Sequence, residues 1–502
     1  MKSEQTKSNT YYFLILFLLS FVFRLILLFV FKFDGLYGQD AYGYLDYSTT
    51  FYNSLAHFQI PPSFYWPVGF PLLTSVFTIF TAGNVWLAGL LISLNSGSLC
   101  AGFVYLIAYD LFPKTEIEQR KKIALYAGII TAFIPLLVKS SIVIMSDSLA
   151  LMFASWSMWQ VVKYTNAFKL KHLIYAAITL SLAVMTRYGY GFLVVPVLIF
   201  IIYSSVKNKI KTGRLILDIA AGSAFGIIIF TPQLYYVLQN GIPNFHTEGG
   251  VGIWPAMWSF LNFFRKDFTT FDGTMHYRMW NVLYNLSPVF HPFYLSLFGF
   301  SFLAGAYLLL KKKNYKVIIF SSGWFLIYYL FFSGGAYQAL RFLISFMPVM
   351  IIVSAYGLAE IKIKESYKKA FLYLGLAAFA LFIFFHMSTF TVQKDKEFEV
   401  VNWVNANIPE NSTVFAFDVT LAINHYTKIK ADEFFNNKQD ELKNKIDSSG
   451  NNVYFILPVE NIKTQWKGLP MEKKYDFITA SYPLQNIGTV NKFTILELQK
   501  KK

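Results

Sequence analysis

The long apolar segments of this chain constrain its fold more than any other feature. The first runs from Tyr11 to Phe31, and about 20 such residues are enough for a helix to cross a bilayer. Further apolar segments follow at 85–110, 123–145, 148–162, 173–187, 190–204, 215–238, 284–310, 317–333, 341–359 and 370–389. The sequence therefore predicts an all-α polytopic membrane protein with about eleven transmembrane helices.

The composition agrees with a chain that is embedded in lipid. Of the 502 residues, 55% are hydrophobic and only 14% are charged, against roughly 25% in soluble domains. Because the chain is embedded in a membrane, its net charge of +16 does not indicate a nucleic-acid partner. Cys100 is the one cysteine, so the chain forms no internal disulfide.

Basic residues cluster in alternate connections between the apolar segments. The clusters lie within 2–7, 114–122, 163–171, 207–214, 311–316 and 362–369. By the positive-inside rule this side is cytoplasmic, which predicts a multi-pass protein of the cell membrane with a cytoplasmic N-terminus. The short segment 68–82 is interrupted by Gly69 and Pro71, and we interpret it as a juxtamembrane or re-entrant helix that does not cross.

The composition changes near residue 390, where charges become mixed and apolar runs shorten to strand length. We therefore predict a transmembrane domain over 1–389, whose first external loop, 32–84, carries juxtamembrane helices. A small extracytoplasmic α/β domain is expected over 390–502, which is within the usual size range of a domain. Its predicted helices are 397–408 and 433–446, and its predicted strands are 413–417, 453–457 and 493–498.

Four charged residues from distant segments are expected at the same external membrane boundary. They are Asp40, Asp147, Arg187 and Arg341. Arginine suits phosphate because its planar fork binds two oxygens and stays charged, so this group fits a reaction at an anionic lipid head group. Structural roles remain open, since Asp147 could cap a helix and either arginine could extend toward lipid phosphates.

The longest predicted external loop, 239–283, is rich in tryptophan and is expected to lie on the bilayer surface. It contributes His246 and Glu248 as candidate substrate-binding residues, together with Tyr44, which follows Asp40 by one helical turn. No pair of histidines has the spacing of metal ligands, so no metal site or cofactor is expected. A divalent metal is nevertheless not excluded by the sequence.

Four short stretches resemble the GT-C membrane glycosyltransferases, in particular the protein O-mannosyltransferase and aminoarabinose transferase superfamily. The stretches are 39–44 (QDAYGY), 64–73 (FYWPVGFPLL), 145–149 (MSDSL) and 341–348 (RFLISFMP). The resemblance covers the layout of about 1–390 and places Asp40 where the family has its catalytic acid. The sequence departs from the family at Ala41, where a second acid often follows, and a single carboxylate does not favour a metal.

This resemblance implies an inverting transfer of a sugar from a polyprenyl-phosphate donor to an external acceptor, which could be a protein, a lipid or a glycan. Asp40 would be the general base, Arg187 and Arg341 would bind the departing phosphate, and Asp147 would orient the acceptor or an arginine. Two other classes remain open. One is a secondary transporter or lipid-carrier flippase, and the other is a polysaccharide polymerase or ligase that would use Arg265, His276 and Arg278.

Overall fold

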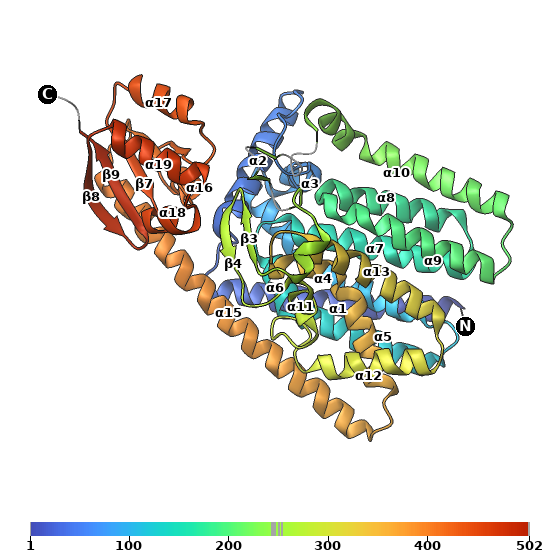
Figure 1. Ribbon diagram of the computed structural model, residues 1–502. Coiled ribbons are helices and arrows are strands. Elements are labelled where there is room, and N and C mark those ends of the chain that lie inside the picture. Colours follow the sequence, from blue (N-terminus) through green and yellow to red (C-terminus); the bar gives the residue numbers. More distant parts are fainter. Residues whose placement is uncertain (1, 242–246, 249–250, 253–254, 500–502) are drawn as a thin grey trace.

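The protein is a bundle of long helices with a small sheet domain at one end (Figure 1). This is a computed structural model, and it describes residues 2–241, 247–248, 251–252 and 255–499. Helix α15 (Glu365–Asn407) runs along one side of the bundle and leads into the sheet domain, while the N-terminus lies at the opposite end of the bundle (Figure 1). The predicted class, a helical polytopic protein with a C-terminal α/β domain, is confirmed.

Seven helical segments in the described part of the chain are long and apolar enough to cross a bilayer. They are α1 (Lys2–Phe31), α4 (Val85–Leu111), η2 with α9 (Tyr188–Leu193, Val194–Lys207), α10 (Thr212–Asn240), α13 (Tyr315–Gly334), η6 with α14 (Leu340–Phe346, Met347–Glu360) and α15. The bent pair α5 (Ile117–Phe133) and α6 (Pro135–Ile142) makes an eighth. The other three predicted crossings correspond to α7 (Ser146–Ala167), α8 (Leu170–Thr186) and α12 (Phe298–Lys311), which are too short or insufficiently apolar by the same criteria.

The predicted span 123–145 is not one straight helix, because it bends by 53° between α5 and α6. Pro135 has no N–H, and the Leu136 N–H donates to the Phe293 carbonyl at 3.1 Å, so two carbonyl groups of the preceding turn have no helical partner. Arg24 of α1 is fully buried and donates from Nη1 to the Ala132 carbonyl at 3.0 Å and from Nε to Ser141 Oγ at 2.6 Å. This intramembrane arginine therefore faces other helices and stabilises the break.

The first predicted external loop folds mainly into helices. Helix α2 (Gly38–Ala56) is followed by α3 (Gly69–Thr78) and η1 (Ile79–Thr81), which together are too short to cross a bilayer. Helix α3 begins directly against the end of α8, since a Cβ added to Gly69 would lie 2.6 Å from the Met185 carbonyl oxygen. Only glycine allows this approach, which positions the chain just before Arg187.

The segment after α10 contains short elements that cover the same end of the bundle. They are β1 (Thr247–Glu248), β2 (Val251–Gly252), η4 (Phe260–Phe264), β3 (Asp267–Thr270), β4 (Gly273–His276), α11 (Asn281–Tyr284) and η5 (Ser287–Val289). The prediction that residues 284–310 form one span is wrong for the first half of this range, because α12 begins only at Phe298. Pro288 and Pro292 precede it, and neither can donate a helical hydrogen bond.

The sheet domain contains five strands in the order β6-β5-β7-β9-β8. The parallel strands β5 (Thr413–Ala416), β6 (Ala431–Glu433) and β7 (Val453–Leu457) are joined by antiparallel β9 (Phe493–Leu498) and β8 (Leu484–Val490). Helices α16 (Thr420–Tyr426), α17 (Gln439–Asp447), α18 (Val459–Gln465) and α19 (Pro470–Ser481) connect them. The three predicted strands are present, whereas the predicted helix 397–408 is the end of α15, which continues through residue 389 without a break.

Candidate active site

Asp40 and Arg341 form an ion pair at the end of the bundle that faces the sheet domain. Asp40 lies in the first turn of α2 and Arg341 lies near the start of η6. Arg341 Nη1 donates to Asp40 Oδ2 at 2.6 Å, and about one third of each side chain is exposed. Because the arginine holds only Oδ2, the second carboxylate oxygen of Asp40 is left for another partner.

Asp147 and Arg187 form a second, more buried pair. Asp147 lies at the N-terminus of α7, where a negative charge is favourable, and Arg187 follows the last residue of α8. Arg187 Nη2 donates to Asp147 Oδ2 at 2.9 Å, and Arg187 Nε donates to Ser146 Oγ at 3.1 Å. The side chain of Asp147 is only 3% exposed, so its charge requires this partner.

Aromatic side chains connect the two pairs. The rings of Tyr44 and Trp66 are stacked at 4.3 Å, and the Tyr44 hydroxyl lies 2.7 Å from Ser146 Oγ, the atom that also bonds Arg187. Burial raises the pKa of Tyr44 to about 12, so its hydroxyl stays neutral. The Phe342 ring centroid lies 5.9 Å from Arg187 Cζ and 5.4 Å from Arg341 Cζ, so both guanidinium groups flank one ring.

The chain matches a known family over part of this region. Residues 61–236 match the family model described as dolichyl-phosphate-mannose-protein mannosyltransferase, PMT_2. Over these residues, which are less than half of its length, the chain is similar to this family of membrane glycosyltransferases. No curated protein matches it in sequence.

Solved structures of membrane glycosyltransferases share the fold of the chain. Apo ArnT from Cupriavidus metallidurans has a TM-score of 0.61 at 12% identity and covers 96% of this chain and 97% of its own. The same protein bound to undecaprenyl phosphate has a TM-score of 0.59 at 13% identity with the same coverage. The apo oligosaccharyltransferase from Archaeoglobus fulgidus has a TM-score of 0.57 at 14% identity, over 90% of this chain and 70% of that one. The predicted GT-C resemblance is confirmed at the level of the fold.

A third cation lies beside the two pairs. Lys139 of α6 interacts electrostatically with Arg341 and Asp147, and its Nζ lies 4.7 Å from the ring centroid of Phe390 and 6.0 Å from that of Tyr37. Among the residues that the structure describes, no carboxylate forms an ion pair with Lys139. The sequence signal was a lysine at the end of a predicted span, which is equally typical of a residue that extends toward lipid phosphates.

Sequence reasoning missed Asp272, at the tip of the β3–β4 hairpin. Figure 1 shows this hairpin between the bundle and the sheet domain. Partial desolvation, followed by the nearby charge of Asp40, raises the pKa of Asp272, although this residue is still exposed at the surface. Gln465 of the sheet domain donates to the Asp272 carbonyl oxygen at 2.9 Å, and the Phe271 ring packs 4.9 Å from Phe435. The hairpin tip is therefore held between Asp40 and the sheet domain.

A buried polar cluster joins the sheet domain to the helix that carries Asp40. Lys394 of α15 donates to the hydroxyl groups of Tyr42 at 2.5 Å and Tyr426 at 2.8 Å. Its ammonium group also lies 3.3 Å from Asp34 and 3.5 Å from Glu397. We call these five residues the Lys394 cluster. It links α2, α15 and α16, so the sheet domain is fixed beside Asp40.

The structure places the predicted residue His276 apart from the Asp–Arg pairs and does not describe the side chains of two others. His246 lies outside the described residues, and Glu248 lies in β1, where only its backbone is described. His276 pairs with Asp267 on the exposed side of the hairpin at 2.9 Å. Within the described ranges, no group of three or more His, Cys, Asp or Glu residues is arranged to hold a metal ion.

Proposed function

We propose that this glycosyltransferase moves a sugar from a polyprenyl-phosphate donor to an acceptor on the extracytoplasmic face of the membrane. The observation that carries this proposal is the convergence of two Asp–Arg pairs at one end of the bundle. The family description and the undecaprenyl-phosphate complex of ArnT support a lipid-phosphate donor. The lysine clusters at the opposite end of the helices support the orientation.

Asp40 is the general base in this proposal. Its free carboxylate oxygen takes the proton of an acceptor hydroxyl as that oxygen attacks the anomeric carbon, and the bond from this carbon to the donor phosphate breaks. A single displacement inverts the anomeric centre and requires no nucleophile from the enzyme. Proton transfer of this kind contributes typically about 10²–10⁴-fold to the rate.

The three cations at the site receive the departing phosphate. Two of them, Arg187 and Arg341, are held by carboxylates, while Lys139 has no such ion-pair partner among the described residues. Fixed donors are most effective where charge develops during the reaction, as it does on a leaving phosphate. Asp147 keeps Arg187 oriented, and Tyr44 supports the same arginine through Ser146. Substrate contacts of His246 and Glu248 remain part of the proposal.

The proposal is tested with purified full-length protein in lipid nanodiscs. A radiolabelled polyprenyl-phosphate sugar is added together with envelope extract as the acceptor source, and release of polyprenyl phosphate and transfer of label are followed. We expect both products to appear together and to be lost with Asp40→Asn. A wild-type protein that turns over neither hexosyl nor pentosyl donors would contradict the proposed function.

A further inference from the structure

The transferase exposes a row of large apolar side chains at the end of the bundle that carries the active site. Phe260, Leu261 and Phe264 of η4 are 66–69% exposed, and Trp280 and Leu283 beside and within α11 are 50–51% exposed. The rings of Phe264 and Trp280 are 6.5 Å apart, so the two segments form one surface. We call these five residues the apolar collar.

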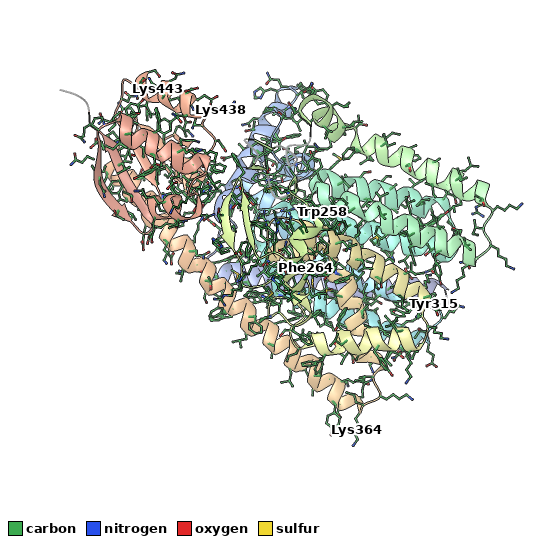
Figure 2. All side chains as sticks on the ribbon, in the orientation of Figure 1. Trp258, Phe264, Tyr315, Lys364, Lys438 and Lys443 are labelled. Atoms are coloured by element: carbon green, nitrogen blue, oxygen red, sulfur yellow. The ribbon has the colours of Figure 1, made fainter. Side chains whose placement is uncertain are left out.

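The collar is fastened to the end of a membrane-spanning helix. Gly334, the last residue of α13, accepts hydrogen bonds from the Ser259 N–H at 2.9 Å and from Asn262 Nδ2 at 2.8 Å. Trp258 Nε1 donates to the Phe331 carbonyl at 3.1 Å. Figure 2 shows Trp258 and Phe264 beside the hairpin. Tyr315, the first residue of α13, and Lys364, which precedes α15, lie far from them at the other end of the bundle. The collar therefore lies at a membrane boundary.

Three exposed cations adjoin the collar. Arg265 and Lys266 follow η4, and Arg278 precedes Trp280. The backbone holds them together, because the Asn281 N–H donates to the Arg265 carbonyl at 3.2 Å. In the part of the chain that the structure describes, none of the three forms an ion pair. Exposed apolar side chains beside unpaired cations are the pattern of a segment that enters the lipid interface.

We propose that the collar is a membrane-docking surface for anionic bilayer lipids of the leaflet next to the active site. Its five apolar side chains enter the acyl boundary, and Arg265, Lys266 and Arg278 bind lipid phosphates. Charge complementarity selects lipid over a second copy of this chain, because two collars in contact would bring three cations against three cations.

Docking of the collar would set the position of the β3–β4 hairpin. The hairpin begins two residues after Arg265 and ends two residues before Arg278, so both of its ends are attached to the collar. Its tip, at Asp272, interacts with Asp40 and the sheet domain. A collar held in the lipid interface therefore holds the hairpin over the active site. Docking of the collar does not require the proposed sugar transfer. The docking surface and the proposed function can therefore be refuted by separate experiments.

The depth of the collar is measured by spin labelling of full-length protein in vesicles of phosphatidylcholine and phosphatidylglycerol. Labels are placed at Leu261→Cys and Phe264→Cys in a Cys100→Ser background, with Lys438→Cys on the sheet domain as the aqueous control. We expect collar labels to be accessible to oxygen and protected from a water-soluble nickel complex, with the reverse at position 438. Nickel access at both collar positions, or spin–spin broadening from a second copy, would overturn the proposal.

Two further measurements keep the inference testable if the cysteine variants do not fold. Quenching of tryptophan fluorescence by brominated lipids is expected to fall in Trp280→Tyr relative to the native chain. The triple variant Arg265→Gln, Lys266→Gln, Arg278→Gln is expected to reduce this quenching at least twofold in anionic vesicles. It should leave the quenching unchanged in vesicles of phosphatidylcholine alone. Equal quenching in all these samples would refute the docking surface.

Discussion

Arg341 Nη1 lies 2.6 Å from Asp40 Oδ2, although the two residues are 301 positions apart in the sequence. The pair joins the first turn of α2 to the start of η6, and a charge-assisted bond of this length is among the stronger ones in proteins. It leaves the other Asp40 oxygen free to receive a proton. The arrangement makes Asp40 the first residue to test.

Asp40→Asn is expected to lower kcat by about 10²–10⁴-fold, because asparagine cannot accept the acceptor proton. Donor affinity should change much less than kcat. The measurement is sugar transfer at saturating donor. Asp46→Asn is the matched control, since Asp46 lies on the same helix and is exposed. Equal rates for wild type and Asp40→Asn would remove Asp40 from the role of base.

Arg187→Lys is expected to weaken donor phosphate binding by about 10-fold or more, because lysine cannot bond Ser146 and Asp147 through a planar fork. Binding of polyprenyl phosphate to purified protein measures this directly. Arg214→Lys is the control, since Arg214 lies in the first turn of α10, away from the Asp–Arg pairs, and its side chain is 57% exposed. If both variants bind polyprenyl phosphate equally well, Arg187 does not contact the phosphate.

Lys394→Met is expected to destabilise the attachment of the sheet domain by about 3–5 kcal/mol, because Asp34 and Glu397 lose their buried cation. Limited proteolysis of the full chain near residue 408 should become faster. The kcat for sugar transfer should fall in the same variant, because the sheet domain no longer holds α2 in place. Lys396→Met, two residues further along α15 and exposed, is the control. Faster proteolysis with unchanged kcat would show that the cluster does not position Asp40.

Gly69→Ala is expected to lower activity by disturbing the end of α8, since the added Cβ would meet the Met185 carbonyl at 2.6 Å. Overpacking of this kind costs about 1–3 kcal/mol. A thermal unfolding scan together with the transfer assay measures both effects. Gly189→Ala serves as the control, because no atom lies within 4 Å of the added methyl group. A fully stable and active Gly69→Ala protein would disprove the close contact.

Burial raises the pKa of Glu433 to about 7 in the sheet domain. Its ordinary pKa is about 4.5, so the unfolded state releases the proton first as the pH rises. The contribution of Glu433 to the stability of the domain should therefore be fully present below pH 4.5 and be lost between pH 4.5 and 7, by at most about 1.4 kcal/mol per pH unit. Hydrogen exchange of β5 and β6 in the full chain measures the change. Glu433→Gln should abolish it, whereas exposed Glu460→Gln should not.

Periodicity and composition were enough to identify the membrane class and the C-terminal domain. An apolar run of about 20 residues is long enough to cross a bilayer, so such runs identify membrane helices. The strand Val453–Leu457 is recognisable because both of its faces are buried and it is therefore apolar throughout. The polar strands β6 and β8 were missed, since edge strands carry few apolar residues. The 53° bend at Pro135 and the uninterrupted course of α15 depend on contacts between distant segments.

The sequence by itself determined which charged residues lie near a membrane boundary, because a charge within a long apolar run is costly. Only the tertiary structure decided how they pair, with Asp40 against Arg341 and Asp147 against Arg187. It also brought Lys139 and Asp272 to the same place, although neither lies in a recognisable motif. Pairing of this kind follows from helix packing, which brings together residues that are hundreds of positions apart and leaves no local pattern in the chain.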